Sequence, residues 1–138
     1  MMGSQSGEAW IGNNVPRVDA QRARRNYVAL SRAIKKGYVA SCHDCSDGGL
    51  GVALAEVAFA GSYGMDVDLD LVPRTTQRND YTLFSESNSR FIVEVPEEYA
   101  SRFESLLKGN AKAIGRIGGN NLTSYSGSRN VISVPVYA

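Results

Sequence analysis

The eleven residues SCHDCSDGGLG, from Ser41 to Gly51, bring together side chains that could do chemistry. They include both cysteines, the only histidine, two aspartates, two serines and a pair of adjacent glycines. A short β-strand pattern precedes them, and an apolar helical pattern follows. Three kinds of site are compatible with these residue types: a Cys-x-x-Cys redox pair, a metal site, and a turn that binds phosphate.

The cysteine pair is the first candidate. Cys42 and Cys45 are spaced as in thioredoxin-like redox sites, which also follow a strand. In those sites the first cysteine lies at a helix N-terminus, where the helix dipole lowers the thiol pKa. Here Ser46 to Gly49 separate Cys45 from the helical pattern, so the sequence favours two bystander thiols. Structural zinc is disfavoured as well, because it needs four ligands, usually in two paired clusters.

The turn before the helix is the second candidate. The N–H groups and the dipole at a helix start favour a phosphate, and glycines let a ligand approach the backbone. The phosphate-binding candidates are Ser46, Asp47, Gly48 and Gly49. Asp44 could hold Mg²⁺ that bridges to the phosphates. The competing interpretation is that Ser46 or Asp47 only N-caps the helix, and the residues leave both possibilities open.

The elements that position this turn can be read from periodicity. We expect residues 1–18 to be a linker or N-terminal tail and residues 19–138 to form one domain. Asp19 is the expected N-cap of a helix that runs to about Lys36, and Gly37 is its expected stop. A strand is predicted over residues 38–42, and the helix after the turn over residues 49–60. The first helix has four apolar residues on one face: Ala23, Tyr27, Leu30 and Ile34.

The rest of the chain predicts an α+β fold with helices packed on a mixed or antiparallel sheet. MDVDLDL, residues 65–71, alternates as a half-buried strand with its three aspartates on a solvated face. Its expected buried residues are Met65, Val67, Leu69 and Leu71. After this strand we expect a polar loop over residues 72–80, a strand in RFIVEV, a helix in PEEYASRFESLLKG and two or three short strands.

Composition excludes several classes of protein. The chain has 138 residues, of which 43% are hydrophobic. Its 15 basic and 14 acidic residues nearly cancel, so the chain as a whole has no positive electrostatic field that would attract nucleic acid or an anionic membrane. No apolar run approaches the ~20 residues of a membrane span. Two cysteines without a secretory signal fit the cytoplasm, which is the expected location. One basic cluster is predicted to be a solvated helix face: Arg22, Arg24, Arg25, Arg32, Lys35 and Lys36.

Two motifs in register resemble a known family. HDCSDGGLGVALAEVAFAG is similar to the HD-x-S-[DE]-GG motif of the C-terminal domain shared by the aminoimidazole ribonucleotide synthetase (AIR synthetase) superfamily. LFSESNSRFIVEVP resembles the second signature of that superfamily. GNNVPRVD and AIGRIGGNNLTSY are similar to stretches of one branch, the phosphoribosylformylglycinamidine synthases. The resemblance runs from Gly12 to Val136.

This resemblance implies an ATP-dependent carbon–nitrogen ligase of purine biosynthesis. Formylglycinamide ribonucleotide, ATP and glutamine-derived ammonia would give the amidine, ADP and phosphate. The chain would be the last domain of the second half of such an enzyme, inactive alone, with ATP and Mg²⁺ as cofactors of the complete enzyme. The implied partners are the remaining domains, a glutaminase subunit, a small accessory subunit and the nucleotide substrates, with no nucleic acid or membrane.

The resemblance also assigns residues. It places Asp44 at a position that contacts Mg²⁺ and Ser46 at one that contacts nucleotide, and it assigns no catalytic residue to this chain. His43, Glu86 and Ser87 would face the ligand. Asn88 departs from the family, which has Gln there, and Cys45 lies at the variable position of the motif. Alternatives are a selenophosphate synthetase or thiamine-phosphate kinase type of domain, a free-standing nucleotide-binding module, or a thiol redox protein.

Overall fold

The computed structural model describes residues 17–136, so the predicted tail lies almost entirely outside the described residues. The helices are α1 Ala20–Lys35, α2 Gly49–Gly61, α3 Asn79–Phe84 and α4 Ala100–Leu107, with 3-10 turns η1 Leu69–Leu71 and η2 Glu97–Tyr99. The strands are β1 Ser41–Asp44, β2 Met65–Asp68, β3 Phe91–Glu94, β4 Gly115–Ile117, β5 Asn121–Ser126 and β6 Arg129–Pro135.

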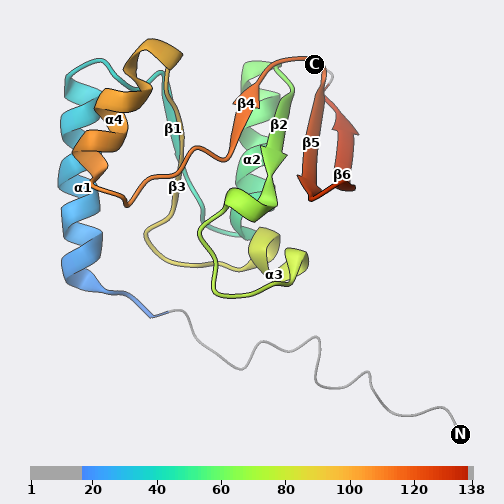
Figure 1. Cartoon of the computed structure of the whole chain (residues 1–138), viewed down its shortest axis with the longest axis horizontal. Coiled ribbons are helices and arrows are strands. Elements are labelled where there is room, and N and C mark those ends of the chain that lie inside the picture. Colours follow the sequence, from blue (N-terminus) through green and yellow to red (C-terminus); the bar gives the residue numbers. More distant parts are fainter. Residues whose placement is uncertain (1–16, 137–138) are drawn as a thin grey trace, which may run out of the picture.

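The strands form two sheets. β1 and β3 pair antiparallel, and the larger sheet has the order β4-β2-β5-β6, in which only β2 and β5 are parallel. α1 and α4 lie side by side at one end of the molecule, and β5 and β6 lie at the other (Figure 1). The predicted α+β class with helices on a mixed sheet is confirmed.

Two apolar clusters hold these layers together. The larger one joins α2 to the four-stranded sheet through residues such as Leu54, Val67 and Leu122. The second joins α1 to α4 through Leu30 and Phe103, with the strand β3 against it. Burial of these side chains is the main favourable term for folding, at about 25 cal/mol per Å² of apolar surface.

The helix α1 begins and ends where the sequence predicts, but the set of residues that it buries differs from the predicted apolar face. The Asp19 carboxylate accepts a hydrogen bond from the Arg22 N–H at 3.0 Å, and Gly37 follows the helix with a φ of +71°. Of the four expected apolar residues, Ala23 and Leu30 are buried, whereas two are about half exposed: Tyr27 and Ile34. Ala33 is fully buried instead, because α4 packs against that side of the helix.

The strand predicted over residues 38–42 lies further along the chain. After Gly37, the Tyr38 N–H still bonds the Ala33 carbonyl of the helix at 3.1 Å, so the chain is not yet free to join the sheet. Pairing begins only at Ser41, opposite Glu94. His43 and Asp44 therefore belong to the strand β1 rather than to the turn.

The prediction of one strand over residues 65–71 is wrong in its second half. β2 ends at Asp68, whose carboxylate accepts a hydrogen bond from the Asp70 N–H at 2.9 Å and caps the turn η1. That turn breaks the alternation, so Leu69 is fully buried and Leu71 is 43% exposed. The polar loop predicted over residues 72–80 also ends early, because the short helix α3 begins at Asn79.

Candidate functional site

The turn between β1 and α2 is shaped by two glycines. Gly48 and Gly49 both have positive φ, +77° and +66°, which residues with a Cβ adopt only with strain. A Cβ on Gly49 would lie 2.8 Å from the Ser85 carbonyl oxygen, so α2 starts in direct backbone contact with the end of α3. The glycine pair therefore has a structural reason that does not require a ligand.

The capping interpretation of Ser46 and Asp47 is wrong. α2 begins after Gly48, which is its N-cap residue, and both earlier residues precede that position. The Gly48 N–H is instead bound by a carboxylate from the other signature motif, Glu86, at 3.0 Å. An anionic side chain thus lies at the positive end of α2, where the helix dipole favours it.

The backbone donors of the turn are already largely engaged. The Gly48 N–H binds Glu86, and the Gly49 N–H donates to the Ser46 carbonyl at 3.1 Å. A phosphate that approaches the Gly48 N–H would have to replace the Glu86 carboxylate. Ser87, next to it, donates its N–H to the Ser85 carbonyl, which folds this loop back against the start of α2.

Asp44 and Ser46 form the polar pair at the mouth of the turn. The Ser46 hydroxyl donates a hydrogen bond to the Asp44 carboxylate, and both side chains are exposed. This hydrogen bond, followed by one from the Asp44 backbone N–H, lowers the pKa of Asp44 below its usual range. Asp44 is therefore an ionised oxygen donor at neutral pH.

His43 is tied to the helix rather than to the turn. Its Nε2 lies 2.7 Å from the Glu56 carboxylate, and its Nδ1 lies 3.9 Å from that of Asp44. Glu56 was missed by sequence reasoning, although it is the only charged residue in the otherwise apolar helix α2.

The cysteines have the environment of bystander thiols. Cys42 is exposed at β1, and Cys45 is buried in the larger core cluster. Partial desolvation raises the pKa of both thiols, even at the exposed residue Cys42, and the Asp44 charge raises them further, although Arg90 partly offsets the effect at Cys45. A raised pKa reduces the thiolate that redox chemistry requires.

The charge around the turn is negative. Asp44, Asp47, Glu56 and Glu86 are all exposed, and they surround the start of α2 or contact residues of β1. Within residues 17–136 there is no group of three or more His, Cys, Asp or Glu side chains suited to hold a metal ion. A free phosphate would be repelled here, so an anion would need an accompanying cation.

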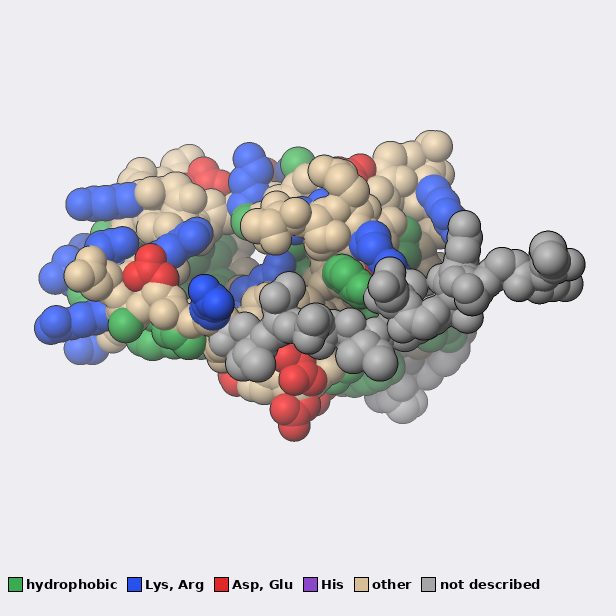
Figure 2. Space-filling view, turned by 90° about the horizontal axis from the view of Figure 1, so that it is seen from below, with side chains coloured by type: hydrophobic (Ala, Val, Ile, Leu, Met, Phe, Trp, Pro, Cys, Tyr) green, Lys and Arg blue, Asp and Glu red, His purple; other side chains and the backbone are tan. Residues whose placement is uncertain are grey.

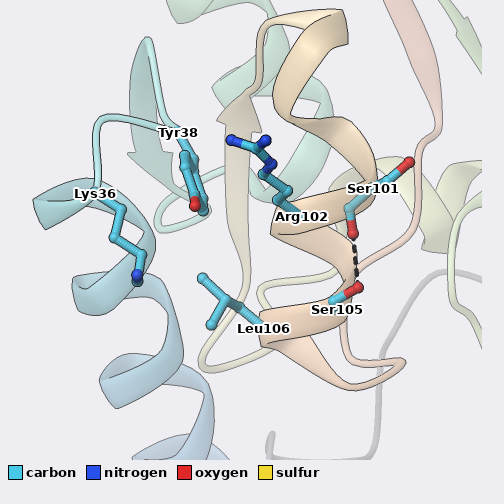
Figure 3. Close-up of a pocket in the computed structure, with 6 residues that line it drawn as sticks. All are labelled: Lys36, Tyr38, Ser101, Arg102, Ser105 and Leu106. Atoms are coloured by element: carbon cyan, nitrogen blue, oxygen red, sulfur yellow. Dashed lines mark hydrogen bonds between the residues drawn. The ribbon is translucent and has the colours of Figure 1, made fainter.

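Two cavities lie away from this turn. One, of about 360 Å³, is a recess beside the C-terminal end of α1, lined by the C-cap residue Lys36, by Tyr38 and by four residues of α4 (Figure 3). The other, of about 560 Å³, lies between β3 and β4 and has a mainly apolar lining. None of the helices within the described part of the chain is long and apolar enough to cross a bilayer.

The fold and the motif turn define a domain class, which comparison with known families identifies. The family model described as AIR synthase related protein, C-terminal domain, matches residues 1–125. The chain therefore belongs to this family, and the resemblance seen in the two signature motifs is confirmed.

Within the family, the chain is homologous to phosphoribosylformylglycinamidine synthase subunit PurL. It is 36% identical over 122 residues to that subunit of Methanocaldococcus jannaschii and 41% identical over 110 residues to that of Thermococcus gammatolerans. These matches cover 88% and 80% of this chain but only 16% and 15% of the relatives. The chain thus spans about one-sixth of the length of these subunits.

Solved structures share the fold. PurL of Thermotoga maritima complexed with FGAR (formylglycinamide ribonucleotide) has a TM-score of 0.80 at 23% identity, over 88% of this chain and 21% of that chain. The same protein complexed with ATP has a TM-score of 0.74 at 24% identity, over 82% and 20%. The PurLQS complex of that organism has a TM-score of 0.79 at 23% identity, over 89% and 22%.

Proposed function

We propose that this chain is the C-terminal domain of a PurL-type synthetase that converts formylglycinamide ribonucleotide, ATP and glutamine-derived ammonia to the amidine, ADP and phosphate. In this proposal the β1–α2 turn contacts the phosphates of an adenine nucleotide. The domain would act with the remaining domains, a glutaminase subunit and a small accessory subunit in the cytoplasm, and would not turn over ATP alone.

One observation carries the proposal: the two signature motifs meet at the start of α2. Glu86 lies 38 positions after Gly48, yet its carboxylate binds the Gly48 N–H at 3.0 Å. Two motifs that are far apart in sequence form one polar surface, with Asp44 and Ser46 beside it. The ATP and FGAR complexes of the Thermotoga maritima relative support a nucleotide as the class of ligand.

The residues at the turn fit a Mg²⁺ that arrives with its nucleotide. Mg²⁺ prefers oxygen ligands and is usually held by one or two carboxylates together with substrate phosphates. Asp44 is ionised at neutral pH and would supply the carboxylate, with the Ser46 hydroxyl next to it. When bound, the ion would neutralise phosphate charge, which the surrounding carboxylates otherwise repel.

Glu86 would then hold the turn until a phosphate takes its place. Its carboxylate occupies the Gly48 N–H, which is the donor that a phosphate at the helix start would use. The neighbouring Ser85 and Ser87 hydroxyls lie 3.4 Å apart and provide further polar groups on the same loop. Ligand binding is therefore expected to change the environment of Gly48 and Glu86 together.

Amide NMR of the ¹⁵N-labelled chain during titration with ADP tests this proposal. We expect shifts of the Asp47, Gly48 and Gly49 amides that appear with Mg²⁺ and disappear when the ion is chelated. The Gly109 amide at the distant end of α4 serves as the internal control. Shifts confined to other regions, or no shift at any amide with Mg²⁺ present, would contradict a phosphate site at this turn.

A further inference from the structure

Basic residues are concentrated in α1 and in the residues on either side of it. Seven of the fifteen basic residues of the chain, and one of its fourteen acidic residues, lie between Arg17 and Lys36. The remainder of the chain is consequently net negative. Lys and Arg side chains gather at the end of the molecule that α1 and α4 form (Figure 2).

Part of this charge is placed where helix stability opposes it. Arg22, Arg24 and Arg25 lie near the positive N-terminal end of α1, and the first turn contains no acidic residue. The helix dipole disfavours a cation in the first turn, where Arg22 lies, and favours Arg32 and Lys35 in the last turn. Like charges three or four residues apart add to the penalty. The stability of α1 therefore accounts for Arg32 and Lys35 but not for Arg22 and Arg25.

One row of these cations borders α4. Arg32 and Lys36 follow Arg25 at intervals of seven and eleven residues, which places all three on one side of the helix. Ala29, on the same side, packs on the α1–α4 apolar cluster together with Leu106. The row extends for about 16 Å along the helix axis.

The recess of Figure 3 lies where this row ends. Lys36 projects from the end of α1, and Arg102 extends from α4 toward Tyr38. The Lys36 Nζ lies 6.0 Å from the centroid of the Tyr38 ring. The recess measures about 360 Å³ and is also lined by Ser101, Ser105 and Leu106. Cations, hydroxyls and a small apolar floor thus surround one concave surface.

These cations form no ion pair with a residue in the described part of the chain. Among the ion pairs formed within residues 17–136, none involves Arg25, Arg32, Lys36 or Arg102. We refer to the recess, lined by Lys36 and Arg102, together with Arg25 and Arg32 of the adjoining row on α1, as the α1–α4 groove. All four are exposed.

We propose that the α1–α4 groove binds an acidic segment of a partner protein. The cations form a row instead of converging on one point, so they match several carboxylates along a segment better than one small anion. The apolar floor suits the stem of a Glu side chain. Nucleic acid is disfavoured because the rest of the chain is net negative and would repel a long polyanion.

The test measures binding of a helical peptide of about 15 residues with three glutamates spaced to face the row. A peptide of the same composition, with its glutamates on three different faces, is the reference, and a single-stranded DNA oligonucleotide is the polyanion control. The variants are Arg32→Gln/Arg102→Gln in the groove and Arg24→Gln/Lys35→Gln on the side of α1 away from α4. Both variants remove two exposed charges, and circular dichroism checks that each is folded.

We expect the groove variant to bind the matched peptide about fivefold more weakly, because it loses two of the ion pairs. The matched control variant should change affinity less than twofold, and the reference peptide should bind more weakly than the matched one. Equal losses in both variants, or equal binding of both peptides, would overturn the proposal. Tighter binding of the DNA than of the matched peptide would also overturn it, in favour of a nucleic acid surface.

Discussion

The Glu86 carboxylate and the Gly48 N–H, 3.0 Å apart, join the two signature motifs of this chain at one point. The contact lies at the N-terminus of α2, where a carboxylate satisfies a backbone donor that the helix itself leaves free. It also brings the loop after α3 beside Asp44 and Ser46. The local structure of the candidate site thus depends on a pair of residues from two separate segments.

Replacing Glu86 should weaken the start of α2. We expect Glu86→Ala to lower the free energy of unfolding by about 1 kcal/mol, comparable to the loss of a helix cap. Urea denaturation measures this, with Glu104→Ala, an exposed glutamate on α4, as the control that should change stability less. Equal stability of Glu86→Ala and wild type would show that the contact does not hold the turn.

Gly49 should tolerate no side chain. Gly49→Ala combines a positive φ with a Cβ 2.8 Å from the Ser85 carbonyl, so we expect a loss of about 3 kcal/mol or more in unfolding free energy. Gly109→Ala is the matched control, because Gly109 also has positive φ, +81°, but open space around it. Its expected loss is about 1 kcal/mol. Similar melting temperatures for the two variants would contradict the tight contact between α2 and α3.

The two thiols should react slowly at neutral pH. Because partial desolvation raises the pKa of Cys42 and Cys45, iodoacetamide labelling should be slow at about pH 7 and accelerate above the ordinary thiol pKa of about 8.5. Exposed Cys42 should be labelled before buried Cys45. The urea-unfolded chain gives the reference rate. Rapid labelling at neutral pH, or a disulfide formed by mild oxidation, would revive the redox alternative.

Ionised Asp70 should stabilise the fold, and this contribution should be lost at acidic pH. Its carboxylate accepts hydrogen bonds from the Ser126 hydroxyl and the Gly127 N–H, both at 2.8 Å, and these lower its pKa, with Arg74 adding to the effect. The pKa of Asp70 is lower in the folded than in the unfolded chain, where it is about 3.9. The stability that this carboxylate contributes is therefore fully present above that unfolded pKa and is lost as the pH falls through the folded pKa.

Melting temperatures between about pH 6 and about pH 2 test this linkage. Wild type should lose more stability on acidification than Asp70→Asn, which keeps the shape but cannot ionise. Asp66→Asn, an exposed aspartate of β2, is the control and should follow wild type. Parallel curves for wild type and Asp70→Asn would rule out the hydrogen-bonded carboxylate as a source of stability.

Elements with strong local signals were predictable from the sequence. The N-cap at Asp19 and the apolar run of α2 correspond to the structure within one or two residues. The end of β2 was not predictable in this way, because Asp68 caps a 3-10 turn within a perfectly alternating stretch. α3 was missed because it is only six residues long, with polar residues in its first turn.

The candidate site was predictable in residue types but not in contacts. The motif indicated Asp44, Ser46 and the glycines, but it gave no sign that Glu86 already binds the Gly48 N–H. That contact depends on how α3 packs against Gly49, which is a tertiary relationship without a local pattern. The glycine pair, interpreted from sequence as a place for a ligand, is required by the same packing.

The most direct test of the account compares two carboxylates of the same turn. Calorimetric titration of ADP, with and without Mg²⁺, should be performed on the complete synthetase carrying Asp44→Asn or Asp47→Asn. Asp44 is the ionised partner of Ser46, so its loss should weaken ADP binding about tenfold with Mg²⁺ and change it little without. Asp47→Asn should bind nearly as wild type. Unchanged Mg²⁺-dependent affinity in Asp44→Asn, or equal losses in both variants, would contradict a Mg²⁺-nucleotide site at the β1–α2 turn.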